Sequence, residues 1–271
     1  MFGQMQDSPL LVSQLIEHAA KLYPKQVIAT KTVEGHWHEY TYLDAALRSR
    51  KLAQALLRLG VKDGDVLGTM AWNTYRHYEC WYGISGMGAI LHTVNPRLFP
   101  EQLDYIINHA QDQYLFIDTT FVPLLEKLQG KLSHVKGYII MTDEAHMPDT
   151  SLVNALCYET LIDQEDGDYA WPTLDERQAT SICYTSGTTG NPKGVLYSHR
   201  SSILHSWGIT AKSVAEMDSD TCVLPIVPMF HANAWGLVYA TAMTGAKVVL
   251  PGPHLDGKSV CEMVNQYEVD M

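Results

Sequence analysis

Glycine and hydroxyl side chains crowd into residues 184–194, which read Tyr-Thr-Ser-Gly-Thr-Thr-Gly-Asn-Pro-Lys-Gly. Glycine allows a backbone to turn several N–H groups inward, Ser and Thr add hydroxyl donors, and Lys193 supplies a fixed positive charge. Residues 179–183 alternate small or apolar side chains with polar ones, a pattern that predicts a buried strand leading into this stretch. Because α/β sheets bind ligands at the carboxyl ends of their strands, the loop is predicted to bind an anion with several phosphates.

A surface turn is the alternative interpretation of this loop, because Gly/Ser/Thr clusters are common between strands. A plain turn does not need this density of hydroxyls followed by Pro192-Lys193-Gly194. A Walker loop does not fit, because the order here is Lys193-Gly194 and no Gly-Lys-Ser/Thr can be read. P-loop kinase and GTPase interpretations therefore lose most of their support.

Two motifs carry a resemblance to a known family. Residues 184–195, with Ser198-His199-Arg200 shortly after, resemble the signature of the adenylate-forming superfamily of acyl-CoA synthetases, peptide-synthetase adenylation domains and luciferases. Residues 228–236, Pro-Met-Phe-His-Ala-Asn-Ala-Trp-Gly, resemble the second motif as written in medium- and long-chain fatty acyl-CoA synthetases. The first motif is highly specific and the second narrows the branch. The resemblance implies an α/β fold of mostly parallel sheets flanked by helices, the incomplete large N-terminal domain of these enzymes.

The resemblance also implies roles for single residues. In the related enzymes the first motif holds the triphosphate of ATP, which assigns that role to Thr185, Ser186, Gly187, Thr188, Thr189, Gly190 and Lys193. Thr185 is also expected to face Mg²⁺. His231 is expected near the reacting carboxylate, so His231 and Lys193 are the expected catalytic residues. Trp235 is expected to wall or gate the acyl tunnel, although a core tryptophan at a helix start explains it nearly as well.

The reaction implied by the resemblance is attack by a fatty carboxylate on the α-phosphorus of ATP. Pyrophosphate leaves, an acyl-adenylate forms, and the thiol of CoA then takes the acyl group, so fatty acid, ATP, Mg²⁺ and CoA are the expected ligands. Such a step needs charge stabilisation more than a protein nucleophile. Cys183 beside the loop is accordingly explained as a small buried residue on a core strand.

Two other chemical patterns are incomplete. Ser85 misses the Gly-x-Ser-x-Gly elbow by one position, so a hydrolase triad has no nucleophile here. His36 and His38 alternate as a metal pair would, but a solvated strand face without a third ligand explains them better.

The composition bounds the class of protein. With 271 residues, 46% of them hydrophobic and 18% charged, the chain is of ordinary globular type. A net charge of −11 disfavours nucleic-acid binding, which needs a basic patch. The five cysteines show no Cys-x-x-Cys spacing, which indicates free thiols in a reducing compartment. The N-terminus lacks signal-peptide features, and the most apolar segment, residues 81–94, is too short to span a bilayer. A soluble cytoplasmic protein is expected, and a homodimer stays open.

The first part of the chain predicts alternating strands and helices. Ser8 is expected to cap a first helix whose apolar face carries Leu11, Leu15, Ala19 and Leu22. A hairpin is expected over residues 26–41, and Thr41 with Asp44 forms a capping-box variant before a second helix that carries Leu43, Leu47, Leu56 and Leu59. Short apolar runs separated by helical segments then indicate a mostly parallel sheet, with strands at residues 66–71, 89–94, 114–118 and 138–142.

An acidic stretch divides the chain into two expected lobes. Residues 1–165 form the first α/β lobe, residues 166–178 the acidic connection, and residues 179–271 the second lobe with the phosphate loop. The second lobe is expected to contain helices at 201–213, 232–243 and 256–267, strands at 221–227 and 246–250, and a beginning strand at 269–271. Because the last strand looks unfinished, we expect a truncated lobe.

The resemblance extends beyond what this chain contains. Full-length relatives carry later motifs that hold Mg²⁺ and the ribose, a hinge, and a small C-terminal domain with a catalytic lysine. We therefore expect an N-terminal fragment of a fatty acyl-CoA ligase that is inactive alone. The alternative is a non-catalytic acyl-binding or association module with the same fold, but such a module has no need of Lys193 and a hydroxyl-rich loop.

Overall fold

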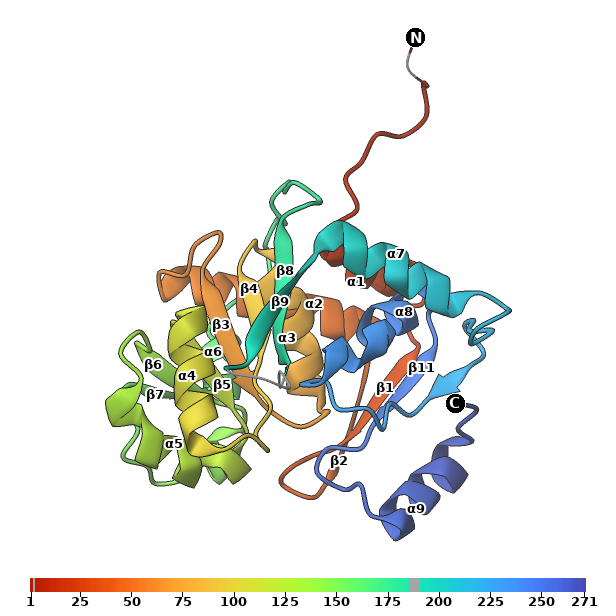
Figure 1. The fold of residues 1–271 in the computed structure, drawn as a ribbon. Helices are drawn as coiled ribbons and strands as arrows, with labels where there is room; N and C mark the ends of the chain where they lie inside the picture. Colours follow the sequence, from red (N-terminus) through yellow and green to blue (C-terminus); the bar gives the residue numbers. More distant parts are fainter. Residues whose placement is uncertain (2, 186–190) are drawn as a thin grey trace.

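Two β-sheets organise the computed structural model, which describes residues 1, 3–185 and 191–271 (Figure 1). The larger sheet has the strand order β7-β6-β5-β3-β4-β8-β9, and the smaller one has the order β10-β11-β1-β2. Neighbouring strands are parallel except in the pairs β1–β2 and β8–β9. The strands are β1 (Val27–Lys31), β2 (Trp37–Thr41), β3 (Val66–Met70), β4 (Ile90–Thr93), β5 (Tyr114–Ile117), β6 (Gly137–Ile140), β7 (Ala155–Cys157), β8 (Ala179–Thr185), β9 (Lys193–Ser198), β10 (Cys222–Val223) and β11 (Lys247–Leu250).

Helices separate and cover the two sheets. The α-helices are α1 (Val12–Leu22), α2 (Tyr42–Arg58), α3 (Tyr75–Gly86), α4 (Pro100–Ala110), α5 (Val122–Leu128), α6 (Tyr158–Asp163), α7 (His199–Thr210), α8 (Leu237–Thr244) and α9 (Gly257–Tyr267). Short 3₁₀ turns are η1 (Thr119–Phe121), η2 (Gln129–Lys131), η3 (Glu144–His146) and η4 (Ala232–Gly236). Helices α1, α2, α3 and α8 contribute to the core between the sheets, and α4 and α5 cover the other face of the larger sheet. Helix α9 packs on the outer face of the smaller sheet. The α/β fold class with mostly parallel sheets is thus as predicted.

Burial on both faces explains why the central strands read as apolar runs. In β5, Tyr114 and Phe116 face the core between the sheets, whereas Leu115 and Ile117 face α4 and α5. All four residues are buried. A parallel strand covered by helices on one side and packed against another layer on the other has no solvated face, so alternation with polar residues is lost.

The start of α1 differs from the prediction. The helix begins at Val12 with Leu11 as its N-cap, so Ser8 and Pro9 lie before it. Leu22, expected in the apolar face, is 56% exposed. The helix begins where its apolar face meets the core, and its N-cap lies three residues after Ser8, because packing outweighs a weak cap.

Helix α2 confirms its cap and corrects its buried face. Thr41 Oγ1 accepts a hydrogen bond from the Asp44 amide, and Asp44 Oδ2 accepts one from the Thr41 amide at 2.9 Å. Leu43, however, is 52% exposed. The helix packs against both α1 and α3, and its buried face is built largely from small residues, namely Ala45, Ala46, Ser49, Ala53 and Ala55 with Tyr42, Leu52 and Leu56.

Both sheets combine strands from the two predicted lobes. Strand β8 joins β4 in the larger sheet, and β1 pairs with β11 in the smaller one, with Ile28 in register with Val248. The Gln26 side-chain amide also donates to the Ser219 and Gly245 carbonyl oxygens at 2.7 and 3.0 Å. The acidic connection at residues 166–178 therefore does not separate one sheet from the other.

The strand predicted at residues 269–271 is not formed, and β10 is shorter than its predicted range of residues 221–227. It contains only Cys222 and Val223, because Pro225 cannot continue a hydrogen-bonded ladder. Asp270 N donates to Cys222 O at 3.0 Å and Leu224 N donates to Met271 O at 2.8 Å.

The five cysteines are free. Within the part of the chain that the structure describes, no helix is long and apolar enough to cross a membrane.

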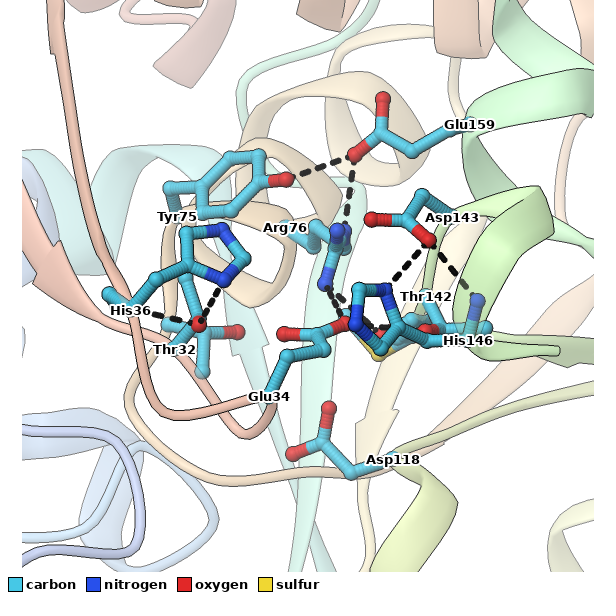
Figure 2. A network of polar contacts seen from close by, with 12 residues as sticks. Thr32, Glu34, His36, Tyr75, Arg76, Asp118, Thr142, Asp143, His146 and Glu159 are labelled. Atoms are coloured by element: carbon cyan, nitrogen blue, oxygen red, sulfur yellow. Dashed lines mark hydrogen bonds and ion pairs between the residues drawn. The ribbon is translucent and has the colours of Figure 1, made fainter. Parts of the chain in front are cut away.

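A buried ion-pair network, centred on Arg76 of α3, ties the β1–β2 turn to the larger sheet (Figure 2). The Arg76 side chain is 4% exposed, and its Nη1 lies 2.8 Å from Glu34 Oε1 in that turn. Its Nε lies 2.7 Å from Glu159 Oε1 in α6. Thr142, just after β6, donates its hydroxyl to Glu34 Oε1 at 2.8 Å. The burial of Glu34 raises its pKa, but the Arg76 charge and the hydrogen bonds outweigh burial and hold this pKa below its usual value.

The ion-pair network around Arg76 continues through Glu159 to a second arginine, Arg48, and from there to Glu79. Arg48 of α2 contacts Glu159 Oε2 at 2.9 Å and Glu79 Oε1 at 2.7 Å. Asp118, which follows β5, lies beside Glu34 in the same view (Figure 2). Its Oδ2 accepts a hydrogen bond from the Trp72 amide at 2.6 Å, while its Oδ1 is buried and has no hydrogen-bond partner among the residues that the structure describes. Burial raises the pKa of Asp118 to about 7, against the opposing effects of that hydrogen bond and of the Arg76 charge.

Candidate functional site

The carboxyl ends of the parallel strands of the larger sheet meet at one edge. Strands β6, β5, β3, β4 and β8 run in the same direction. Asn73 and Asp118 follow β3 and β5 at this edge, and Thr185 ends β8. Ligands of α/β sheets bind at such an edge, so Thr185, at the start of the predicted phosphate loop, ends its strand where the topology favours a ligand.

Thr185 and Lys193 lie directly opposite each other at the end of the β8–β9 hairpin from which the connecting loop leaves. Thr185 Oγ1 donates to Lys193 O at 3.5 Å, a long hydrogen bond, and both residues are exposed. The other predicted phosphate ligands, Ser186, Gly187, Thr188, Thr189 and Gly190, lie outside the described residues. The structure therefore brings the two ends of the loop together and leaves the hydroxyl and ammonium groups of these ends accessible to an anion.

His231 is exposed and stands directly before a left-handed turn. The residues of this turn, η4, all have positive φ: Ala232 44°, Asn233 53°, Ala234 49°, Trp235 55° and Gly236 74°. The helix predicted from residue 232 begins only at Leu237 as α8. Left-handed geometry costs an L-residue about 1–2 kcal/mol, so this turn must be held by its surroundings.

Two neighbouring elements hold the left-handed turn. Asn233 Nδ2 donates to Ser181 Oγ of β8 at 3.1 Å. On α7, His205 Nε2 contacts Trp235 O at 3.1 Å, and Ser206 Oγ donates to Gly236 O at 3.2 Å. The Trp235 side chain is consequently displayed at the surface with 60% of its area exposed. The alternative interpretation of Trp235 as a core residue is therefore wrong.

Trp235 stands between two cavities with mainly apolar linings. One has a volume of about 510 Å³ and is lined by Tyr197, Ser201, Ser202, His205, Ile209, Ala232, Asn233, Trp235, Gly236 and Tyr239. The other has a volume of about 340 Å³ and includes Ile209, Val223, Leu224, Ile226, Val227, Trp235 and Leu237 in its lining. Because the indole of Trp235 lines both, its position controls the shape of the apolar space. No hydrogen bond among the described residues joins His231 to Thr185 or Lys193.

Two residues near the motif around His231 were missed by sequence reasoning. Arg97, in the loop after β4, has its guanidinium carbon 5.9 Å from the centroid of the Phe230 ring, and its side chain is exposed. Asn73 makes hydrogen bonds to the segment that precedes His231. A polar or charged residue soon after a predicted parallel strand was the available signal for both.

The chain belongs to the AMP-binding enzyme family, whose model matches residues 16–271. This confirms the predicted membership of the adenylate-forming superfamily. The fold agrees with solved structures at low identity. The anthranilate CoA ligase AuaEII in complex with anthranoyl-AMP has a TM-score of 0.83 at 21% identity, covering 99% of this chain and 50% of that one. The long-chain-fatty-acid-CoA ligase FadD1 from Archaeoglobus fulgidus has a TM-score of 0.83 at 20% identity, covering 99% and 52%.

Within that family, the similar curated relatives include medium- and long-chain fatty-acid–CoA ligases. It is 44% identical to the medium-chain-fatty-acid–CoA ligase of Ectopseudomonas oleovorans over 264 residues, which is 97% of this chain and 48% of the relative. It is 45% identical to the 3-methylmercaptopropionyl-CoA ligase of Ruegeria lacuscaerulensis over 271 residues, with coverages of 100% and 50%. It is 40% identical to the long-chain-fatty-acid–CoA ligase of Thermus thermophilus, with coverages of 96% and 46%. The chain spans about half the length of these relatives.

Proposed function

We propose that this chain forms the N-terminal half of an ATP-dependent fatty acyl-CoA ligase. The observation that carries the proposal is a physical link between the phosphate loop and the apolar space. Strands β8 and β9 flank the loop, and Tyr197 of β9 lines the larger cavity. Ser181 of β8 holds Asn233 of the same cavity wall at 3.1 Å. A fatty acid in the cavity and a triphosphate on the loop would thus share one wall.

The proposed reaction joins a fatty carboxylate to the α-phosphorus of ATP, releases pyrophosphate, and passes the acyl group to the thiol of CoA. Lys193 and the loop hydroxyls would bind the triphosphate, and His231 would contact the carboxylate. The exposed Arg97 guanidinium beside Phe230 would add local attraction for anions. Local cations matter because the net charge of −11 repels anionic substrates at long range.

Magnesium is part of the proposal through the exposed hydroxyl of Thr185. Mg²⁺ in nucleotide sites is held by few protein oxygens together with phosphate oxygens and water, and a single hydroxyl at the loop fits this. The part of the chain that the structure describes contains no group of three or more His, Cys, Asp or Glu that could hold a metal by itself. The metal would neutralise phosphate charge when ATP is bound.

We further propose a cytoplasmic enzyme, which the five free cysteines support because reducing compartments keep thiols unpaired.

The activity is tested in the full-length protein by ATP–pyrophosphate exchange driven by fatty acids. Lys193→Ala is expected to lower the exchange rate roughly ten- to a hundredfold, because a charged donor to phosphate is worth about 1.5–3 kcal/mol. Lys258→Ala is the matched control, since its side chain is 86% exposed and its helix α9 packs on the outer face of the smaller sheet. Unchanged kinetics in Lys193→Ala would make the loop a structural turn. Fatty-acid binding without any exchange in the wild type would instead favour the non-catalytic acyl-binding module.

Trp235 is expected to shape the preference for acyl chain length. An apolar tunnel contributes about 0.8 kcal/mol for each buried methylene, so kcat/KM should climb about fourfold per CH₂ until the tunnel is full. Trp235→Ala should flatten this climb or shift its optimum, while acetate stays a poor substrate. Trp207→Ala on α7 is the control, because Trp207 is 66% exposed and lies outside the linings given above. If Trp235→Ala leaves the profile as in the wild type, the indole does not border the acyl chain.

A further inference from the structure

The side chain of Asn73 uses both ends of its amide on one short segment. It lies between β3 and α3 and is 3% exposed. Its Nδ2 donates to Pro225 O at 2.8 Å and to Val227 O at 3.0 Å, and its Oδ1 accepts from Met229 N at 2.7 Å. Both amide protons and the carbonyl oxygen are therefore engaged.

The segment of residues 225–229 depends on this side chain. It follows the two-residue strand β10 and belongs to no strand or helix. Buried backbone groups need hydrogen-bond partners, and here a side chain supplies them where a neighbouring strand would otherwise do so. Met229 and Phe230 are 0% and 2% exposed, whereas His231 next in the chain is exposed. The direction in which His231 leaves the core is thus set by the residues that Asn73 holds.

The backbone around Asn73 is itself fixed from two sides. Asn73 O accepts from Gly252 N at 2.9 Å, just after β11. Gly252 has a φ of +58°, and a Cβ there would lie 2.1 Å from Lys31 O, so a larger residue does not fit. On the other side the Trp72 amide donates to Asp118, and the Trp72 ring lies 6.3 Å from the Phe230 ring in an edge-to-face arrangement.

We propose that Asn73 is a positioning residue that sets the place of His231 and of the left-handed turn after it. It acts through the backbone of residues 225–229 and does not itself touch substrate. The catalytic part of this inference rests on the proposed function, whereas the positional part concerns this chain alone.

Two variants separate the hydrogen bonds. Asn73→Ala removes all three. Asn73→Asp keeps an acceptor for Met229 N and turns an oxygen toward the carbonyls of Pro225 and Val227, so it loses both donors. Asn108→Ala is the matched control, because Asn108 also binds a loop through both ends of its amide, at Lys131 O and Ser133 N, far along the chain from this segment.

The first measurement is amide hydrogen exchange in the 271-residue chain. Asn73→Ala is expected to speed exchange of the Met229 amide at least tenfold, with Asn73→Asp intermediate and Asn108→Ala unchanged. Exchange in β3 serves as the internal check that the sheet is intact. Wild-type exchange rates at Met229 in Asn73→Ala, with β3 still protected, overturn the inference.

The second measurement is the steady-state kinetics of the full-length enzyme. Asn73→Ala is expected to lower kcat with fatty acid ten- to a hundredfold while the KM for ATP changes less than twofold, which a general loss of folded enzyme would not produce. Faster exchange with unchanged kcat overturns the catalytic part of the inference. Faster exchange in a protein whose wild type has no ligase activity overturns the proposed function and leaves the positional part standing.

Discussion

Arg76→Met is expected to lower the free energy of unfolding by about 3–5 kcal/mol, because it leaves buried carboxylates without their cation. Glu34 suffers most, since its side chain is 3% exposed and Arg76 is its ion-pair partner. Glu159 keeps a contact with Arg48 at 2.9 Å. Methionine preserves much of the length and the apolar stem of arginine, so the loss reports on charge and hydrogen bonding more than on packing.

Urea unfolding of the 271-residue chain measures this loss. Arg177→Met is the matched control, because Arg177 is 82% exposed in its pair with Asp175 and such surface pairs contribute less than about 1 kcal/mol. Adding Glu34→Gln to Arg76→Met is expected to recover part of the stability, since it removes the stranded charge. A loss in Arg76→Met no larger than in the Arg177 control would show that solvent reaches the network.

Asp118→Asn is expected to make the free energy of unfolding fall less steeply as the pH rises from 5.5 to 8. Burial raises the pKa of Asp118 to about 7 in the folded chain. An unfolded aspartate titrates near pH 3.9, so between these values the folded state binds more protons and the wild type loses stability as pH rises. At about 1.4 kcal/mol per pH unit, the variant should gain about 2 kcal/mol over the wild type between pH 5.5 and pH 8.

The comparison must be made against the wild type at each pH, because buried histidines act in the opposite direction. Burial lowers the pKa values of His38, His77 and His199 to about 4. Their unfolded forms bind protons below about pH 6.5, so they destabilise the fold as pH falls. Asp175→Asn is the control, since hydrogen bonds from Arg177 lower the pKa of Asp175 to about 2 and keep it charged throughout. An Asp118→Asn difference that stays constant across this range would mean that Asp118 is ionised at both ends.

Elements specified by local signals were predictable from the sequence. Two such predictions were confirmed, namely the capping box of Thr41 and Asp44 and the strands β3 to β6. Each of these features depends on residues close together in the sequence. The predicted start of α1 was wrong, because Ser8 offers a local cap whereas the apolar face that packs begins at Val12. A local capping signal indicates where a helix can begin, but tertiary packing determines where it does begin.

The site was only partly predictable for the same reason. Thr185 and Lys193 could be named from the sequence because the phosphate motif is continuous, and the β8–β9 hairpin places them opposite each other. The left-handed geometry of Ala232 to Trp235 was missed, because none of these four residues is glycine and the groups that hold them come from β8 and α7. Asn73 was missed because its partners lie about 150 residues further along the chain.

The smaller sheet sets an order of events during synthesis on the ribosome. Strand β1 pairs in parallel with β11, with Ile28 opposite Val248, so β1 emerges long before its central partner exists. At roughly 5–20 residues per second, the wait is on the order of ten to forty seconds. During that time β1 has only the antiparallel β2 beside it, and an isolated hairpin is marginally stable. The apolar faces of α1, α2 and α3 meet β1 and β11 in the same core, so the nascent chain exposes apolar surface until β11 has been made. Substitutions that strengthen the β1–β2 hairpin should therefore raise the yield of native protein in cells, even where they change the free energy of unfolding of the finished protein little.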